Sequence, residues 1–408
     1  MRLKDISVLS PRYTGTLSDS MASFVPMESL REDCIEPKEI SVAEGSSKYN
    51  FFADDDLLVA KVTPCFENGN ISVARGLKGG IGFGSSEIFV LRFRRDVNPR
   101  YMFYLTTSSS FKDKACATMC GVGGLKRISP LFMRTYELDL PTITEQNRIV
   151  DYLDKQLSSI NQRMKLIDRE FQTLSELKHS EINSVVSRGL DMSVPMKDSE
   201  IDWIGEIPSH WSVSRIKDVA TLGSGTTPKS GVDKYYEGGT IPWLNTSDVQ
   251  NRLIVSNSFF ITDKAVEDYP VLKYYPKDTV LLAMYGGGTI GNVGLMTYPA
   301  MINQACCAMV PKRNKVDAKY LYYYLLSKRS RIISTGFGGT QINLSQKLIA
   351  QYFIALPPIE EQRKIVAFLD NKEEQLDALY KNIDSQIAKL KSLKKALVNE
   401  VMNGQRIV

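Results

Sequence analysis

Two long segments of the chain show the clearest alternation of apolar and polar positions. A repeat of about 3.5 residues is typical of a coiled-coil seam rather than of a helix lying on a globular core. In the first segment the apolar positions are Val150, Leu153, Leu157, Ile160, Met164, Ile167, Phe171 and Leu174. In the second, interrupted by Glu373 and Lys394, they are Val366, Leu369, Leu376, Tyr380, Ile383, Ile387, Leu390, Leu397 and Val401. The pattern predicts two helices of about 40 residues, each roughly 60 Å long.

Both predicted helices have recognisable start and stop signals. Thr142 followed by Glu145 predicts a capping box, and Pro358 suits the first turn of the second helix. The glycines in SRG (187–189) and NGQ (403–405) predict left-handed C-caps. We therefore expect helical segments within 140–189 and 356–408.

The rest of the chain, 1–139 and 190–355, has short β-prone runs broken by glycine clusters. Examples are FFADDDLLVAKV (51–62), EIFVLRF (87–93) and DTVLLAMY (278–285). This pattern predicts two mixed α/β (α+β) domains, which we call module 1 (1–139) and module 2 (203–355). The segment KDSEIDWIGEIPSHWSV (197–213) is expected to be an ordered linker into module 2, so that 190–355 holds the linker and the module.

The chain is an internal repeat. LPTITEQNRIVDYLD (140–154) returns as LPPIEEQRKIVAFLD (356–370), RLKDIS (2–7) as RIKDVA (215–220), and GVGG (121–124) as GFGG (336–339). The order is module, helix, module, helix. A lone 60 Å amphipathic helix would leave its apolar seam exposed to water. We therefore expect an antiparallel intramolecular coiled coil with pseudo-twofold symmetry. Helices that join separate chains are the alternative.

Polar, glycine-containing loops in the modules are the candidate binding site. In module 2 they are 223–236, 243–248, 284–292, 302–304 and 336–345. Their side chains are of the types that reach phosphates and base edges in DNA, although ordinary turn chemistry explains the glycines equally well. The candidates in module 2 are Lys229, Lys234, Asn245, Thr246, Tyr285, Asn303, Gln304, Gln341 and Asn343. Those in module 1 are Lys48, Asn50, Lys61, Asn68, Lys126 and Arg127.

Composition narrows the class of protein only a little. The 408 residues are 43% apolar and 24% charged, which predicts a folded chain of several domains. A formal net charge of +5 permits an anionic partner without requiring one. No apolar stretch approaches the ~20 residues of a membrane span and the N-terminus has no signal-peptide pattern, so a cytoplasmic location is expected.

Sequence motifs for catalysis are missing. Pro228 in GSGTTPKS stands where a phosphate-binding P-loop needs glycine, and HExxH, GxSxG and NPPY do not occur. Six cysteines without CxxC spacing and only two histidines predict no metal site and buried, reduced thiols. The chain is expected to bind rather than catalyse. A coiled-coil scaffold without DNA readout and a stand-alone DNA-modifying enzyme are the alternatives.

The repeated helix openings, together with SRGLDMSVPMKDSEIDWIGEIPSHW (187–211) and GGTQINLS (338–345), resemble the specificity subunits of type I restriction-modification systems. The resemblance covers essentially the whole chain. It implies two target recognition domains that each read half of a bipartite DNA target, and helices that set the spacer and dock two methyltransferase subunits. It also implies that SAM, and ATP with magnesium in any restriction subunits, belong to those partners, with no cofactor on this chain and one copy of it per complex.

Overall fold

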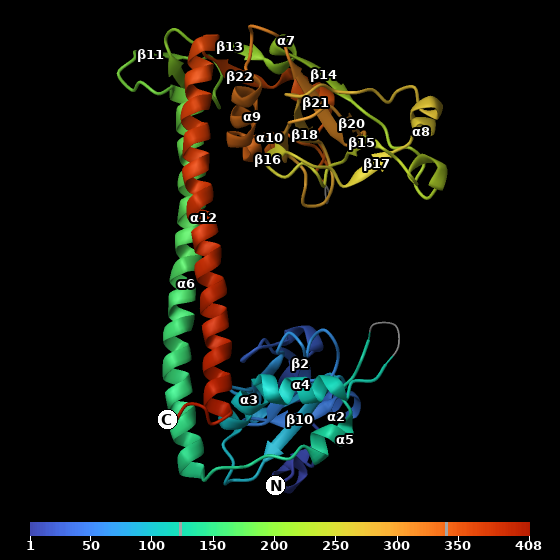
Figure 1. The fold of residues 1–408 in the computed structure, drawn as a ribbon, viewed down its shortest axis with the longest axis vertical. Coiled ribbons are helices and arrows are strands. Elements are labelled where there is room, and N and C mark those ends of the chain that lie inside the picture. Colours follow the sequence, from blue (N-terminus) through green and yellow to red (C-terminus); the bar gives the residue numbers. More distant parts are fainter. Residues whose placement is uncertain (122–124, 339–341) are drawn as a thin grey trace. The chain divides into compact units, whose positions relative to one another are not determined.

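The computed structural model describes residues 1–121, 125–338 and 342–408 (Figure 1). The chain forms two compact units. Unit 1 is Met1–Asp168 with Ile383–Val408, and unit 2 is Arg169–Asn382. Each unit contains one module and parts of both long helices, and each is described by itself.

Module 1 of unit 1 consists of short strands and short helices. The strands are β1 (Ser7–Leu9), β2 (Met21–Val25), β3 (Leu30–Arg31), β4 (Cys34–Ile35), β5 (Lys38–Ser41), β6 (Asn50–Ala53), β7 (Leu57–Ala60), β8 (Ile71–Val73), β9 (Ile81–Gly84) and β10 (Ile88–Phe93). The helices are α1 (Leu3–Ile6), α2 (Val42–Lys48), α3 (Pro99–Thr107), α4 (Ser109–Ala117) and α5 (Pro130–Thr135), with 3-10 turns η1 (Met27–Ser29) and η2 (Lys78–Gly80). One antiparallel sheet has the order β1-β10-β7-β8, and a second, mixed sheet has the order β5-β2-β9-β6.

Module 2 of unit 2 is built in the same way. Its strands, with those of the preceding linker, are β11 (Met196–Asp198), β12 (Glu206–Pro208), β13 (Ser212–Arg215), β14 (Ala220–Ser224), β15 (Ile241–Leu244), β16 (Arg252–Ile254), β17 (Phe259–Ile261), β18 (Val280–Ala283), β19 (Val293–Met296), β20 (Met301–Ile302), β21 (Cys306–Pro311) and β22 (Phe353–Leu356). Its helices are α7 (Ile216–Val219), α8 (Asp263–Asp268), α9 (Ala318–Ser327), α10 (Arg329–Ser334) and α11 (Gln346–Gln351), with the 3-10 turn η3 (Asp233–Tyr235). The sheets have the orders β14-β21-β18-β19-β16 and β17-β15-β20, and β11-β12 and β13-β22 form separate pairs.

The duplication read from the sequence is present in the topology. The strand order β1-β10-β7-β8 returns as β14-β21-β18-β19, and β5-β2-β9 returns as β17-β15-β20. The second match keeps the strand directions, since β2 and β15 each pair antiparallel on one side and parallel on the other. The prediction of two mixed α/β modules is confirmed.

The two predicted long helices are α6 (Ile143–Arg188, 46 residues) and α12 (Ile359–Met402, 44 residues). The capping box before α6 is confirmed, because the Thr142 N–H donates to Glu145 at 3.0 Å and the Glu145 N–H donates to the Thr142 hydroxyl at 3.4 Å. Both helices end at glycines with left-handed backbone, Gly189 at φ 77° and Gly404 at φ 70°.

Within each unit α6 and α12 pack together and run antiparallel (Figure 1). In unit 1 the first part of α6, including Leu153, shares a core with the last part of α12, including Leu397. In unit 2 the last part of α6, including Val186, shares a core with the first part of α12, including Leu369. The predicted antiparallel coiled coil is therefore confirmed as the fold of the helices.

The predicted seam positions differ in burial. Eight are buried: Val150, Leu153, Leu157, Ile167, Leu369, Ile383, Leu397 and Val401. Eight are half-buried: Ile160, Met164, Leu174, Val366, Leu376, Tyr380, Ile387 and Leu390. Phe171 stays 41% exposed, although its ring lies 5.0 Å from that of Tyr380. Ile182, Val185 and Ile365 are buried as well, because the helices also pack against their own module there.

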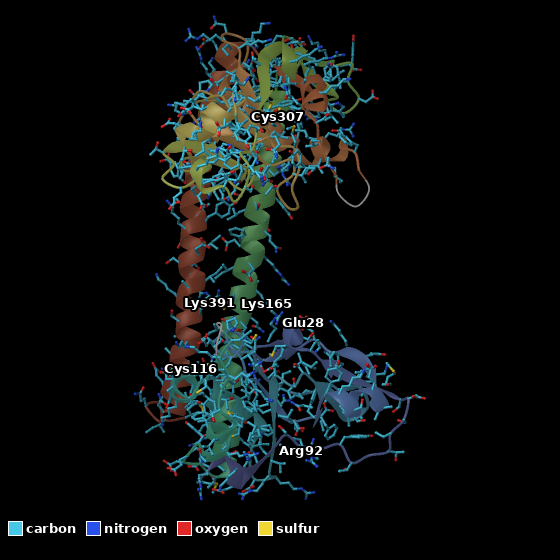
Figure 2. All side chains as sticks on the ribbon, turned by 90° about the vertical axis from the view of Figure 1, so that its right-hand side faces the viewer. Glu28, Arg92, Cys116, Lys165, Cys307 and Lys391 are labelled. Carbon is cyan, nitrogen blue, oxygen red and sulfur yellow. The ribbon has the colours of Figure 1, made fainter. Side chains whose placement is uncertain are left out.

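The cysteines correct one expectation. Cys306 and Cys307 are buried, and burial raises the pKa of the Cys307 thiol to about 12. Figure 2 labels Cys307 among the side chains of module 2. Cys34 and Cys120, however, are exposed, and the other two are intermediate. The prediction of buried thiols holds only for the pair in β21, a strand whose residues 306–309 are all buried.

Candidate nucleic-acid interface

The polar loops of module 2 converge although they are far apart in the sequence. The Gly225 N–H donates to the Asn303 carbonyl at 3.3 Å, and the Asn303 N–H donates to the Leu244 carbonyl at 2.9 Å. The Leu344 N–H donates to the Met284 carbonyl at 2.8 Å. The loops that follow β14, β15 and β20 are thereby joined to each other, and the loop that follows β18 is joined to the segment before α11.

Gly225 is a position where this convergence needs glycine. A Cβ there would lie 1.7 Å from the Ile302 carbonyl oxygen, which is backbone and cannot move aside. Gly286 has φ +117°, and a Cβ there would lie 2.6 Å from the hydroxyl oxygen of Thr289 in the same loop. Gly225 is thus a close-approach point between two loops, and Gly286 is a left-handed turn within one.

Several candidate side chains in this cluster have partners inside the module. Gln304 is exposed, and its Oε1 accepts from the Thr227 hydroxyl at 2.5 Å. The Asn245 Oδ1 accepts from the Ser247 N–H at 2.7 Å, and the Asn303 Oδ1 accepts from the Ala305 N–H at 3.1 Å. The two asparagine oxygens therefore shape turns, while Gln304 presents an amide at the surface.

The remaining candidates of module 2 are spread more widely. Lys229 is exposed on its loop, whereas Lys234 forms a 2.9 Å ion pair with Asp268. Hydrogen bonding to Asp268 raises the pKa of Lys234. Thr246 and Tyr285 are half-buried, and Asn343 forms an antiparallel bridge with Phe337. The predicted contact Gln341 lies outside the described residues.

Module 1 builds the matching part of its fold with charged residues. The Lys61 N–H donates to the Glu87 carbonyl and the Ile128 N–H to the Lys61 carbonyl, both at 2.9 Å, repeating the connections around Met284 in module 2. Arg127 donates to the Glu87 carboxylate at 2.7 Å. Burial lowers the pKa of Lys61, and the charge of Glu87 opposes that shift. Lys61, Lys126 and Arg127 therefore lie close together in the fold, and Glu87 contacts both Lys61 and Arg127.

Three other candidates of module 1 lie elsewhere. Lys48 forms a 3.0 Å ion pair with Glu44 one helical turn away in α2. The Asn50 amide donates to the Ile88 carbonyl at 2.9 Å, which ties β6 to β10. Asn68 is exposed in the turn before β8. The individual contacts of these candidates with DNA stay predictions.

Sequence reasoning missed the acidic and hydroxyl partners in both clusters. Glu87 and Thr227 were not singled out, because each meets its partner only through the tertiary fold. It also missed Gln146 and Gln362, which are 0% exposed. A signal for these two was present, since the repeated helix openings share the dipeptide Glu-Gln at equivalent positions.

Two further kinds of feature are missing from the described ranges. No group of three or more His, Cys, Asp or Glu side chains in them is arranged to hold a metal ion. No helix among them combines the length and apolarity needed to cross a membrane.

Comparison with known proteins finds a likeness in the second half of the chain. Residues 208–389 match the family model of the type I restriction modification DNA specificity domain. This segment contains nearly all of module 2 and much of α12. The resemblance to type I specificity subunits that the sequence indicated is confirmed.

Particular relatives extend the likeness. Over 194 residues the chain is 33% identical to the specificity subunit of the type I restriction enzyme EcoEI from Escherichia coli. The matched segment covers 44% of this chain and 33% of that one. The chain thus matches about a third of that relative's length. A structure from work on complex assembly in the type I R-M system matches with TM-score 0.75 and 20% identity over 98% of this chain and 96% of that one. The HsdS subunit of Thermoanaerobacter tengcongensis matches with TM-score 0.53 and 20% identity over 100% and 96%. At this identity both likenesses show the fold alone.

Proposed function

We propose that this chain is the DNA-binding specificity subunit of a type I restriction-modification complex. The observation that carries the proposal is the duplication of one α/β module, each copy with a cluster of polar loops and each attached to the helix pair. The family match over 208–389 supports the same conclusion for module 2. Each module reads one half of a bipartite target in double-stranded DNA.

Recognition in this proposal divides into two kinds of contact. Lysines such as Lys229 and Lys126 contact phosphates and position the module, whereas Gln304 contacts base edges and supplies specificity. Phosphate contacts release counterions, so affinity falls steeply with salt. The helix pair acts as a ruler, because its length fixes the separation of the two reading surfaces.

Catalysis belongs to partner subunits in this proposal. Two methyltransferase subunits dock on the chain and bring SAM, and any restriction subunits bring ATP and magnesium. One copy of the chain is present in each complex, in the cytoplasm where the DNA is. The chain itself holds no cofactor and catalyses no reaction.

A reconstitution with purified components tests this function against its two rivals. The chain alone, given DNA, magnesium and labelled methyl donor, should incorporate no label, and adding the methyltransferase subunits should restore methylation at a gapped target. Label incorporated by the chain alone would favour the stand-alone enzyme. DNA affinity should fall with salt as phosphate contacts require, whereas a scaffold without DNA readout would show no such slope.

A further inference from the structure

Each module shares an apolar core with the long helices, and in each a buried glutamine adds the same hydrogen-bonded contact between module and helix. In unit 1 the Gln146 Oε1 accepts from the Asn98 N–H at 2.7 Å, and its amide donates to the carbonyls of Asp96 and Pro141 at 3.2 and 2.9 Å. Asn98 caps the N-terminus of α3, and Gln146 lies in the first turn of α6. The side chain thereby joins the module to the helix through three hydrogen bonds.

Unit 2 repeats this attachment atom for atom. The Gln362 Oε1 accepts from the Asp317 N–H at 2.8 Å, and its amide donates to the carbonyls of Lys315 and Pro357 at 3.2 and 2.8 Å. Asp317 caps α9, the counterpart of α3. Both glutamines are fully buried, and each side-chain amide forms hydrogen bonds with backbone groups that would otherwise lack a partner.

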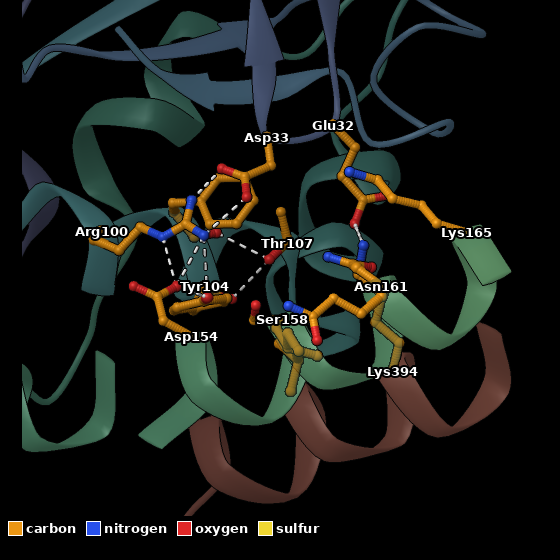
Figure 3. A pocket seen from close by; sticks show the side chains of 14 residues that line it. Glu32, Asp33, Arg100, Tyr104, Thr107, Asp154, Ser158, Asn161, Lys165 and Lys394 are labelled. Carbon is orange, nitrogen blue, oxygen red and sulfur yellow. Dashed lines mark hydrogen bonds and ion pairs between the residues drawn. The ribbon is translucent and has the colours of Figure 1, made fainter. Parts of the chain in front are cut away.

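A second contact follows about two helical turns along each long helix. In unit 1 Arg100 of α3 donates to Asp154 at 3.0 Å and also binds Asp33, while the Tyr104 hydroxyl donates to the same Asp154 carboxylate (Figure 3). Burial opposes the charge of Arg100, but the bonds to Asp33 and Asp154 outweigh it and raise its pKa. These side chains line a cavity of about 440 Å³.

In unit 2 lysine replaces arginine at the equivalent place. Lys319 of α9 donates to Asp370 at 2.5 Å, and the Tyr323 hydroxyl donates to Asp370 at 2.8 Å and to Glu373 at 3.0 Å. Asp154 and Asp370 both end the repeated opening, and Gln146 and Gln362 hold the same place within it. The opening is thus repeated because the same two attachments are made twice.

These attachments affect how precisely the helix pair can set the length of the DNA spacer. Across a module about 30 Å broad, a tilt of roughly 6° on its helix would move the far surface by about 3.4 Å, one base-pair step. Two contacts spaced along the helix resist such a tilt, which a single contact could not do.

We infer that Gln146 and Gln362, with their cation–tyrosine–aspartate contacts, are positioning residues that restrict the DNA target to one spacer length. The inference rests on the proposed function. It assigns selectivity for the spacer to the joints between modules and helices as well as to the length of the helices.

The test uses the full complex of this chain with its methyltransferase subunits. Initial methylation rates are measured on DNA that carries both half-sites at the wild-type spacer and at spacers one base pair shorter and longer. The variant Gln362→Met keeps the side-chain volume and removes the three hydrogen bonds. The matched control is Gln375→Met, an exposed glutamine of α12 whose amide bonds only within the helix, to Asn371 at 2.8 Å.

In Gln362→Met the rate at the altered spacers, relative to the wild-type spacer, should rise roughly tenfold, with half-site preference unchanged. Gln375→Met should keep the wild-type ratio. An unchanged ratio in Gln362→Met, with methylation retained, would overturn the inference. If that variant does not assemble, Tyr323→Phe, which removes only a hydroxyl, decides by the same ratio. A wild-type complex with no gapped target at all would instead defeat the proposed function.

Discussion

Lys178 of α6 and Glu373 of α12 form a 2.8 Å ion pair at one of the two positions where the apolar pattern of α12 is interrupted. Glu373 also accepts from the Tyr323 hydroxyl of module 2. At the other interruption Lys394 pairs with Glu32 of module 1 at 3.0 Å. Both breaks in the heptad pattern are therefore polar contacts, and each involves the module of its own unit.

The Lys178–Glu373 pair should couple α6 and α12 measurably. Both side chains are 26% exposed, so solvent screens the pair only in part. A double-mutant cycle with Lys178→Met and Glu373→Gln, followed by chemical denaturation of the full chain, should give a coupling free energy of about 0.5–1 kcal/mol. The pair Arg363–Glu360, whose side chains are 59% and 73% exposed, should give less. Equal coupling in both pairs would contradict the role given to Glu373.

Leu153 should be among the most sensitive positions of α6. It is 0% exposed in the core that module 1 shares with both long helices, so Leu153→Ala should lower the free energy of unfolding by about 2–5 kcal/mol. Leu166 lies on the same helix but is 61% exposed, so Leu166→Ala should change the free energy of unfolding by less than about 1 kcal/mol. Denaturation curves of the two variants provide the measurement, and similar losses would refute the assigned packing face.

Lys328 should make stability depend on pH in the alkaline range. Burial lowers its pKa to about 8, while its Nζ donates to Asn183 of α6 at 2.6 Å. An unfolded lysine has a pKa of about 10.4, so between these values the unfolded state binds more protons and the free energy of unfolding rises with pH. From pH ~8 to ~10.5, the wild-type chain should gain about 1–3 kcal/mol relative to Lys328→Met. A constant difference between the two chains would contradict the lowered pKa.

Two substitutions in module 2 should separate base contacts from phosphate contacts. Gln304→Ala should relax the preference at one half-site by about 1–3 kcal/mol, whereas Lys229→Ala should weaken all sequences alike and reduce the salt slope by about one. Lys48→Ala in module 1 is the variant with which Lys229→Ala is compared, because the Lys48 ammonium already forms an ion pair with Glu44. Binding to a panel of half-site variants at several salt concentrations is the measurement. A uniform loss from Gln304→Ala would remove its assignment as a base-reading residue.

The length of the helix pair should set the DNA spacer. Four residues inserted into each of α6 and α12, about one turn or ~6 Å, should lengthen the preferred spacer by one or two base pairs while keeping the seam nearly in phase. Methylation of a series of spacers by the complex would show the shift. An unchanged optimum would mean that the helices do not measure the gap.

The sequence predicted the features that depend on local patterns. The heptad repeat, the Thr142–Glu145 capping box and the terminal glycines gave the helices, and their repetition gave the duplicated fold. Features that depend on residues meeting through the tertiary fold were missed. Gln362 reads as an ordinary polar helix residue until α9 is placed against it, and the helical period alone did not show that Phe171 remains exposed.

The candidate DNA contacts show the same limit. Lysines were chosen for charge, but Lys234 is paired with Asp268, which the strands β15, β16 and β17 separate from it in the sequence. The spacing of residues in the sequence could not predict that the glycine loops of module 2 converge, because backbone hydrogen bonds between distant segments bring them together. Loop composition therefore pointed to segments that meet in the fold, but it did not show which partners their side chains have.

The most direct test of the proposed function is a map of modified bases across the host genome, with and without the gene for this chain. One bipartite motif with a fixed gap should be methylated in the parent, and this methylation should be lost in the deletion strain. Restoring the gene should restore the same motif. A methylated gapped motif that persists without the gene, or a restored chain that modifies no such motif, would contradict the assignment.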